Sequence, residues 1–282
     1  MQQIVTLIAG PSAEDALRAC VAALSGAADW LAPGACDIAG VSEEAARAAA
    51  GKRPIDIVVQ PEARRRKKLL VADLESTIIE NEMLEELADF LGLRAPVAEI
   101  TRRAMNGEID FVAALTERVA LLRGLPESVL DEAGTHIRVM PGAQALVATL
   151  RRHGVTTALV SGGFTVFAEQ VAAELGFDRV VANHLVIADG KLTGTVQLPI
   201  VTAATKHATL LSLAGELGIE LDATMAVGDG ANDLPMLQAA GLGVAFRAKP
   251  AVAAAARWRI DHADLTALLY AQGYRQEEIA AI

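Results

Sequence analysis

The sequence is short of cysteine, of aromatic residues and of positive charge. Only Cys20 and Cys36 occur among 282 residues, too few for a disulfide framework, so we expect reduced thiols and a cytoplasmic location. Aromatic residues make up 4% of the chain, and 25 Lys and Arg against 35 Asp and Glu leave a formal net charge of −10. A nucleic-acid-binding surface needs basic residues and often stacking rings. We therefore expect no nucleic-acid partner.

Long apolar segments are also missing. The mean hydropathy is +0.34, yet charged residues interrupt every apolar run before the roughly 18 residues that a membrane-spanning helix requires. The first residues, Met1 to Ile4, contain no basic stretch followed by an apolar one. The sequence therefore predicts neither a signal peptide nor a membrane partner.

Residues 1–62 predict a small α+β domain. The chain is 52% hydrophobic, enough for a sizeable core, and its length allows about two domains of ~150 residues each. Strand-like runs at 4–9, 37–39 and 55–59 are separated by helical patterns, and this β-α-β-α-β pattern ends at Pro61. This segment contains no cluster of catalytic residue types, so we expect the chemistry to lie elsewhere.

A basic run, Arg64 to Lys68, follows this segment. Such a run could form a nucleic-acid or membrane patch. We favour a solvated linker over residues 63–68, because the run is short and the rest of the chain carries −15 without its five positive charges.

Residues 69–282 predict an α/β domain with a doubly wound parallel sheet. Short continuous apolar runs, typical of strands buried on both faces, alternate with helical patterns. These runs lie at 69–72, 156–160, 180–182, 224–227 and 243–246. The interval 79–136 contains only helical patterns, which indicates a helical cap inserted after the first strand. Residues 184–196, with Asp189-Gly190 in the middle, predict a β-hairpin.

Polar, glycine-rich clusters follow three of these strands. Residues 73–77 (DLEST) come directly after the first strand, 161–163 (SGG) end the second, and 228–233 (GDGAND) end the fourth. Ligands of open α/β sheets bind beyond the carboxyl ends of the strands. The three clusters therefore predict one site at this edge of the sheet.

The residue types in these clusters suit phosphate-ester hydrolysis. A carboxylate that attacks a phosphate dianion meets charge repulsion, which a divalent cation relieves. Asp73 and Asp229 offer the oxygen ligands that Mg²⁺ prefers. Ser161, the Gly162 amide and Lys206, from a helical stretch before the fourth strand, offer donors for the phosphoryl oxygens.

This set of motifs in this order resembles the haloacid dehalogenase (HAD) superfamily of phosphotransferases, over about residues 68 to 250. Within it, Glu82 lies nine residues after Asp73, Met105-Asn106-Gly107 precedes Phe111, and Arg118 follows at helical spacing. These features resemble the phosphoserine phosphatase family. That resemblance implies hydrolysis of O-phospho-L-serine to L-serine and phosphate through an aspartyl-phosphate, the final step of serine biosynthesis. The first 62 residues resemble a degenerate ACT-type regulatory domain, and since such domains often pair, a homodimer is possible.

The resemblance also implies roles for individual positions. Glu82 would take the substrate ammonium and Arg118 its carboxylate, and Met105 and Phe111 would shape the lid. The implied set comprises the catalytic Asp73 and Glu75; the Mg²⁺ ligands Asp73, Glu75 (through its carbonyl), Asp229 and, in support, Asp233; the phosphate-binding Ser161, Gly162, Lys206 and Asn232; and the substrate-binding Glu82, Arg118, Met105 and Phe111.

Glu75 departs from the family pattern, which has Asp at this position. The side chain is longer by about 1.5 Å, whereas the intrinsic acidities of Asp and Glu differ by only ~0.4 pH unit, so geometry is what changes. Three interpretations follow: a working acid after local adjustment, a slow enzyme with a long-lived aspartyl-phosphate, or an impaired regulatory relative. We favour the first. The alternative substrate class is another small phosphate monoester, or a second alcohol as phosphoryl acceptor.

Overall fold

The computed structural model describes residues 2–105 and 108–281. The first strands build an antiparallel sheet of order β2-β3-β1-β4. Its elements are β1 (Gln3–Ala9), α1 (Glu14–Ala22), β2 (Ala28–Ala32), β3 (Ala35–Ala39), α2 (Glu43–Ala50) and β4 (Ile55–Pro61). β1 is buried on both faces: Val5 and Leu7 pack with the helices, and Ile8 packs into the main core of the molecule.

The main sheet has six parallel strands in the order β12-β11-β10-β5-β6-β7. The strands are β5 (Leu69–Ala72), β6 (Thr156–Phe164), β7 (Arg179–Asn183), β10 (Thr224–Gly228), β11 (Leu242–Phe246) and β12 (Trp258–Ile260). The chain winds from β5 to one side through β6 and β7, and then to the other side through β10. The carboxyl ends of β5, β6 and β10 therefore flank the point where the winding reverses, where ligands bind in such sheets.

Helices cover both faces of this sheet, so the doubly wound α/β fold that the sequence predicts is confirmed. The side chains of β5 alternate between the two faces of the sheet: Leu70 and Ala72 face one apolar cluster, and Leu69 and Val71 face the other. The helices are α7 (Ala143–Arg152), α8 (Thr165–Leu175) and α12 (Ala267–Tyr270) on the first side, and α9 (Ala203–Glu216), α10 (Leu234–Ala239) and α11 (Pro250–Ala255) on the second. Short 3-10 helices lie at Glu62–Arg64, Leu221–Ala223 and Gln276–Glu278.

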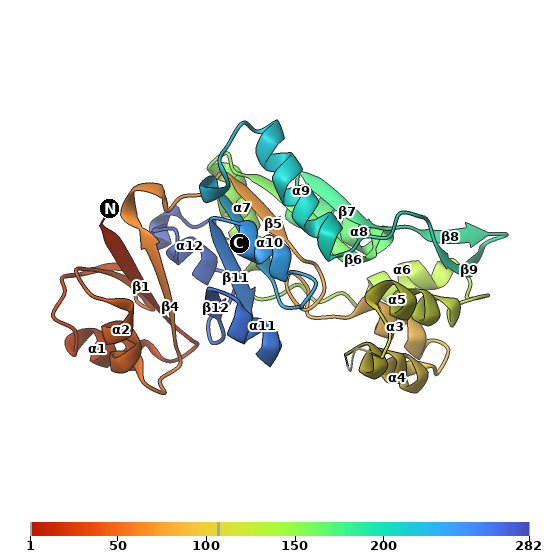
Figure 1. Cartoon of the computed structure of the whole chain (residues 1–282), viewed down its shortest axis with the longest axis horizontal. Coiled ribbons are helices and arrows are strands. Elements are labelled where there is room, and N and C mark those ends of the chain that lie inside the picture. Colours follow the sequence, from red (N-terminus) through yellow and green to blue (C-terminus); the bar gives the residue numbers. More distant parts are fainter. Residues whose placement is uncertain (1, 106–107, 282) are drawn as a thin grey trace.

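A helical cap lies beyond the carboxyl ends of the strands, at the opposite end of the molecule from the N-terminal sheet (Figure 1). It consists of α3 (Met83–Asp89), α4 (Arg94–Met105), α5 (Phe111–Ala120) and α6 (Ser128–Gly134). The hairpin β8 (Leu185–Ala188) and β9 (Lys191–Val196) projects beside α5 and α6. Positive φ angles at Asp189 (51°) and Gly190 (69°) fit the type I′ turn that the sequence indicates.

The basic run differs from the solvated linker that we expected. The side chain of Arg65 is 10% exposed and contacts Asp37 at 2.5 Å, and it also donates to Thr6 Oγ1 at 2.9 Å. Lys67 is buried, and burial lowers its pKa to about 8. Arg65 therefore belongs to the contact between the N-terminal sheet and the rest of the molecule, whereas the Lys67 ammonium donates to the Asp222 carbonyl (2.9 Å) of the α/β domain.

A second contact across this interface comes from Asp56 of β4. Its carboxylate accepts hydrogen bonds from the backbone amides of Asp261 (2.8 Å), His262 (3.1 Å) and Ala263 (2.8 Å), directly after β12. Hydrogen bonds to an ionised carboxylate are about twice as strong as neutral ones. This carboxylate is therefore a main polar anchor of the N-terminal sheet.

Across residues 2–105 and 108–281, every helix is too short or too polar to cross a membrane.

Candidate active site

A cavity of about 770 Å³ lies between the carboxyl ends of the strands and the cap. Its wall takes residues from the sheet edge and from the cap together. Among the residues predicted from sequence, it includes Asp73, Glu75, Glu82, Phe111, Arg118, Gly162, Asp229 and Asn232. Ser161, Lys206 and Asp233 are buried and contact residues of this wall. Met105 ends α4, but its side chain, like Asn106 and Gly107, lies outside the described part of the chain.

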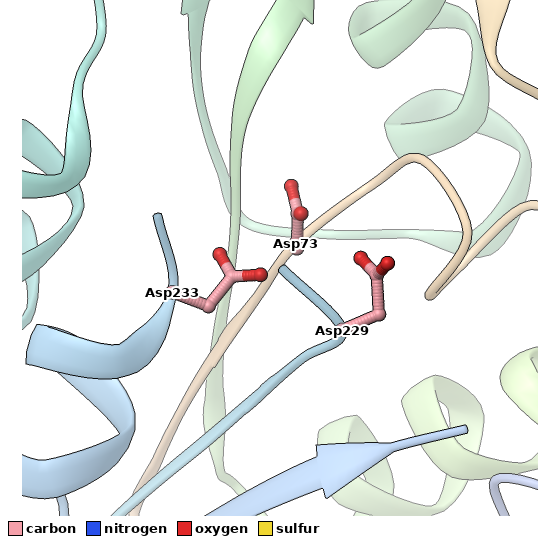
Figure 2. A group of neighbouring side chains, drawn as sticks. All are labelled: Asp73, Asp229 and Asp233. Carbon is pink, nitrogen blue, oxygen red and sulfur yellow. The ribbon is translucent and has the colours of Figure 1, made fainter. Parts of the chain in front are cut away.

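Three carboxylates meet at the floor of the cavity. Asp73 follows β5, Asp229 follows β10, and Asp233 lies at the start of α10; one oxygen of each falls within 4.8 Å of the others. Figure 2 shows the three side chains gathered around one space, with Asp73 on the chain after β5 and Asp229 and Asp233 on the chain after β10. Their exposed fractions are 6%, 7% and 0%. Such a buried group of like charges requires positive charge nearby.

Lys206 supplies part of that charge. Its Nζ lies 2.6 Å from Asp73 Oδ1 and 2.7 Å from Asp233 Oδ1. Burial alone would lower the pKa of Lys206, but the two carboxylates outweigh it and raise that pKa. One buried ammonium cannot balance three ionised carboxylates. A divalent cation with oxygen ligands fits this donor set.

The carboxylates also influence one another. Burial, followed by the Asp233 carboxylate, raises the pKa of Asp73, and Lys206 opposes the shift. Burial raises the pKa of Asp229 to about 6, although Lys249 Nζ lies 3.8 Å from its carboxylate. Holding these groups ionised therefore depends on cations at the site.

The glycine before Asp229 is required by packing. A Cβ at Gly228 would lie 2.4 Å from the Asp233 side chain, and Asp233 in turn accepts a hydrogen bond from the Gly230 amide (2.9 Å). The turn 228–233 thus folds back on itself and brings Asp229 and Asp233 to the same point. This explains why a glycine precedes Asp229.

The Ser161-Gly162-Gly163 turn is an irregularity in β6. The register between β6 and β7 shifts between Val160 and Phe164, as in a β-bulge. Ser161 Oγ accepts a hydrogen bond from the Gly163 amide (2.8 Å), so its side chain folds back on the turn. Phe111 of the cap lies over this turn, because a Cβ at Gly162 would lie 3.1 Å from its Cζ.

Glu75 lies where the sheet edge meets the cap. Its Oε1 accepts a hydrogen bond from the Met83 amide (2.9 Å) at the start of α3. A Cβ at Gly163 would lie 2.9 Å from its carboxyl group, so the space for the longer side chain exists because position 163 is glycine. Burial and the Glu82 carboxylate raise the pKa of Glu75 to about 8. The structure therefore accommodates Glu at this position through a specific contact.

Glu82 and Arg118 lie on the cap side of the cavity. Ser76 Oγ donates to Glu82 Oε1 (2.7 Å). Arg118 donates from Nε to the Ala114 carbonyl (3.2 Å), and burial lowers the pKa of its guanidinium. Within the described residues, no carboxylate lies within 4.0 Å of this guanidinium. Glu75, Glu82 and Glu85 are near enough to oppose that shift, but none forms a salt bridge with Arg118, which leaves its N–H donors suited to an anionic ligand.

Lys249 and Asn183 are among the polar residues of the site that were not predicted. Lys249, just after β11, contacts Asp229 from the rim; a lone surface lysine gives no sequence signal. Asn183, at the end of β7, hydrogen-bonds the Gly162 carbonyl (2.8 Å). Its place at a strand end next to the Ser-Gly-Gly turn was the one available signal.

Comparisons with known proteins agree with this geometry. The haloacid dehalogenase-like hydrolase family model matches residues 70–238. The chain is 44% identical over 250 residues to a phosphoserine phosphatase of Streptomyces coelicolor, covering 86% of this chain and 61% of that protein. It is 48% identical over 199 residues to a phosphoserine phosphatase of Streptococcus thermophilus, covering 71% and 93%.

Among solved structures, a HAD family hydrolase from Salmonella enterica serovar Typhi has a TM-score of 0.85 at 30% identity, with 95% of this chain and 97% of that one covered. The chain spans about three fifths of the length of the Streptomyces coelicolor relative. The family model covers more than half of this chain, and the polar strand ends that it includes meet in one cavity. The chain therefore belongs to the haloacid dehalogenase-like hydrolase family.

Proposed function

We propose that this chain is a Mg²⁺-dependent, cytoplasmic phosphatase that hydrolyses O-phospho-L-serine to L-serine and phosphate. One observation supports the choice of substrate: a single cavity combines a carboxylate cluster and Lys206 at its floor with Glu82 and Arg118 in its cap wall. The substrate has a phosphate, an ammonium and a carboxylate, and each has a partner of opposite charge in this arrangement. The two named relatives act as phosphoserine phosphatases, which supports the same assignment.

In the proposed reaction, an Asp73 oxygen attacks phosphorus and the bond to the serine oxygen breaks. Glu75 gives a proton to the leaving oxygen and later takes one from the water that cleaves the aspartyl-phosphate. Lys206, Ser161 and the Gly162 amide hold the phosphoryl oxygens as charge develops on them. Mg²⁺, held by Asp73, Asp229 and the Glu75 carbonyl with Asp233 in support, would supply positive charge against the repulsion between nucleophile and phosphate.

Substrate selection follows from the cap. The Arg118 guanidinium presents paired N–H donors that match a carboxylate, and Glu82 offers a carboxylate to the ammonium. Phe111, which lies against Gly162, excludes water from the phosphoryl group when the cap is closed. A neutral sugar phosphate would leave the charges of Glu82 and Arg118 without partners.

The proposal is tested by measuring phosphate release from O-phospho-L-serine, glycerol phosphate and glucose phosphate, with Mg²⁺ and after chelation. We expect O-phospho-L-serine to be hydrolysed at least about tenfold faster than the other esters, and all activity to disappear on chelation and return with Mg²⁺. Equal rates on the three esters would contradict the substrate assignment. Full activity after chelation would contradict the metal requirement.

Replacing Arg118 with alanine should raise KM for O-phospho-L-serine about 10- to 100-fold, because a charged hydrogen bond contributes about 1.5–3 kcal/mol and 1.4 kcal/mol corresponds to tenfold. Phenyl phosphate, which lacks the amino-acid groups, should be hydrolysed at an unchanged rate. Arg103→Ala is the matched control: this cap arginine pairs with Glu117 at 2.8 Å and should leave both substrates unaffected. An equal loss on both substrates would show that Arg118 does not bind the substrate carboxylate.

A further inference from the structure

Asn183 is a buried amide between the two halves of the phosphoryl site. It ends β7 and is 1% exposed. Its Nδ2 donates to the Gly162 carbonyl (2.8 Å), and its Oδ1 accepts from the Val201 amide (2.8 Å). Both ends of the side chain are therefore used, and both partners are backbone groups.

The first partner belongs to the irregular turn of β6. A β-bulge leaves backbone groups outside the regular strand pairing, and in this turn Asn183, which pairs with Phe164 in the register, reaches back to the Gly162 carbonyl. The amide on the other side of the same peptide group, that of Gly163, donates to Ser161 Oγ (2.8 Å). The Gly162–Gly163 peptide is thus held at both its carbonyl and its N–H, which fixes the direction of the turn.

The second partner leads into the helix of Lys206. Val201 immediately precedes Thr202, the residue that caps α9, and the Lys206 amide bonds the Thr202 carbonyl (3.0 Å) in the first helical turn. Lys206 then reaches the carboxylates of Asp73 and Asp233. One amide side chain therefore sets the spacing between the Ser161–Gly163 turn and the first turn of α9.

We infer that Asn183 is a positioning residue that holds the Ser161–Gly163 turn and the Lys206 helix in register for the transferred phosphoryl group. This rests on the proposed function only in that both segments are assigned to phosphoryl binding. The hydrogen bonds of the Asn183 side chain go to Gly162 and Val201 and not to Glu82 or Arg118, so its loss should affect the phosphoryl group and spare recognition of the amino-acid part. Misplacement of a reacting group by about 1 Å can cost 10²-fold in rate.

The test compares Asn183→Asp with Gln272→Glu. Both changes replace a buried amide by the carboxyl group of the same shape. Gln272 is also 1% exposed, and its side chain is also bonded at both ends, to the Lys67 amide (2.9 Å) and the Leu268 carbonyl (2.9 Å). Lys67 lies just before the amino end of β5, whereas the cavity lies at the carboxyl end of that strand. We expect Asn183→Asp to lower kcat about 100-fold, with KM for O-phospho-L-serine changed less than threefold. We expect Gln272→Glu to leave kcat within threefold of wild type, although its loss of thermal stability should be similar to that of Asn183→Asp.

Inhibitor binding separates positioning from general damage. In the Asn183→Asp protein, inhibition by orthovanadate, which occupies the phosphoryl site, should weaken at least tenfold, while inhibition by L-serine should not change. Asn183→Ser, whose hydroxyl serves only one of the two bonds, should lie between wild type and Asn183→Asp, and it provides the comparison should the acidic variant not fold. Equal losses in kcat for the Asn183 and Gln272 variants, or parallel weakening of both inhibitors, would overturn the inference.

The vanadate measurement also keeps this inference distinct from the proposed substrate. Stabilisation of the wild-type protein by orthovanadate, read as a thermal shift, needs no turnover of O-phospho-L-serine. A wild-type protein that binds vanadate but ignores O-phospho-L-serine and L-serine contradicts the proposed function alone. A vanadate shift that is the same in wild type and in Asn183→Ser contradicts the role of Asn183 alone.

Discussion

Replacing Asp73 with asparagine should lower phosphate release from O-phospho-L-serine by at least about 10⁴-fold, on the scale seen when a nucleophile is removed. The amide nitrogen and oxygen of asparagine cannot form the acyl-phosphate bond. The remaining groups of the site would stay in place, because Lys206 keeps its contact with Asp233 at 2.7 Å. The loss should therefore appear in kcat, measured with saturating substrate and Mg²⁺.

Stability provides the control for this variant. Burial and the neighbouring Asp233 carboxylate raise the pKa of Asp73. Removing the charge of Asp73 should therefore leave the melting temperature, measured without metal, unchanged or higher. Asp222→Asn, at an exposed aspartate that pairs with Arg64, should retain full activity. Activity of Asp73→Asn within tenfold of wild type would show that Asp73 is not the nucleophile.

Replacing Lys206 with methionine should have the largest effect on folding. The change leaves Asp73 and Asp233 buried without their shared ammonium, and breaking a buried ion pair in this way costs about 3–5 kcal/mol. We expect a loss of about 3 kcal/mol in the free energy of unfolding at pH 7, measured by urea denaturation without metal, together with loss of phosphatase activity.

The pH dependence of this loss has a definite sign. Asp73 loses this ammonium in the variant, and its pKa is raised in the folded chain, chiefly by burial. Its charged form therefore destabilises the fold at neutral pH and stops doing so as it takes up a proton. The stability difference from wild type should therefore shrink as pH falls toward ~4. In wild type, the raised pKa of Lys206 means that its contribution is fully present below the ordinary lysine pKa and is lost only at higher pH.

Two further variants check the cause. Asp233→Asn added to Lys206→Met should recover part of the lost stability, because only one uncompensated carboxylate of the pair remains. Lys249→Met is the matched control: its side chain is 54% exposed and 3.8 Å from Asp229, and a surface pair of this kind contributes at most about 1 kcal/mol. A Lys206→Met protein as stable as Lys249→Met would contradict the buried-pair account.

The sequence predicted the main sheet well but missed two strands. Strands such as β5 and β10 are continuous apolar runs, which a sheet covered on both faces requires. β12 has only three residues, with the charged Arg259 in its middle, and β2 contains Asp29 and several alanines. Both are edge strands of their sheets, and tertiary pairing rather than residue pattern defines them.

The site was predictable where chemistry needs particular side chains. Asp73, Asp229 and Lys206 follow a known order along the chain, and the structure brings them together. Asn183 acts through backbone groups that no sequence pattern marks. The basic run was misjudged for a related reason: the burial of Arg65 depends on Asp37, 28 residues away, and charge alone gave no sign of that partner.

The hydrogen bonds that the Asp56 carboxylate accepts from the amides after β12 have a consequence for shorter versions of this protein. A protein lacking residues 1–62 would expose three backbone donors at residues 261–263 and the apolar surface against which Ile8 and Val58 pack. The Streptococcus thermophilus relative aligns over 199 residues that make up 93% of its length, so that protein is shorter than this chain by about the size of such a segment. Removing residues 1–62 from this chain therefore requires polar substitutions at that face. A truncation point chosen from the alignment alone would leave an exposed apolar surface and three backbone amides without their hydrogen-bond acceptor.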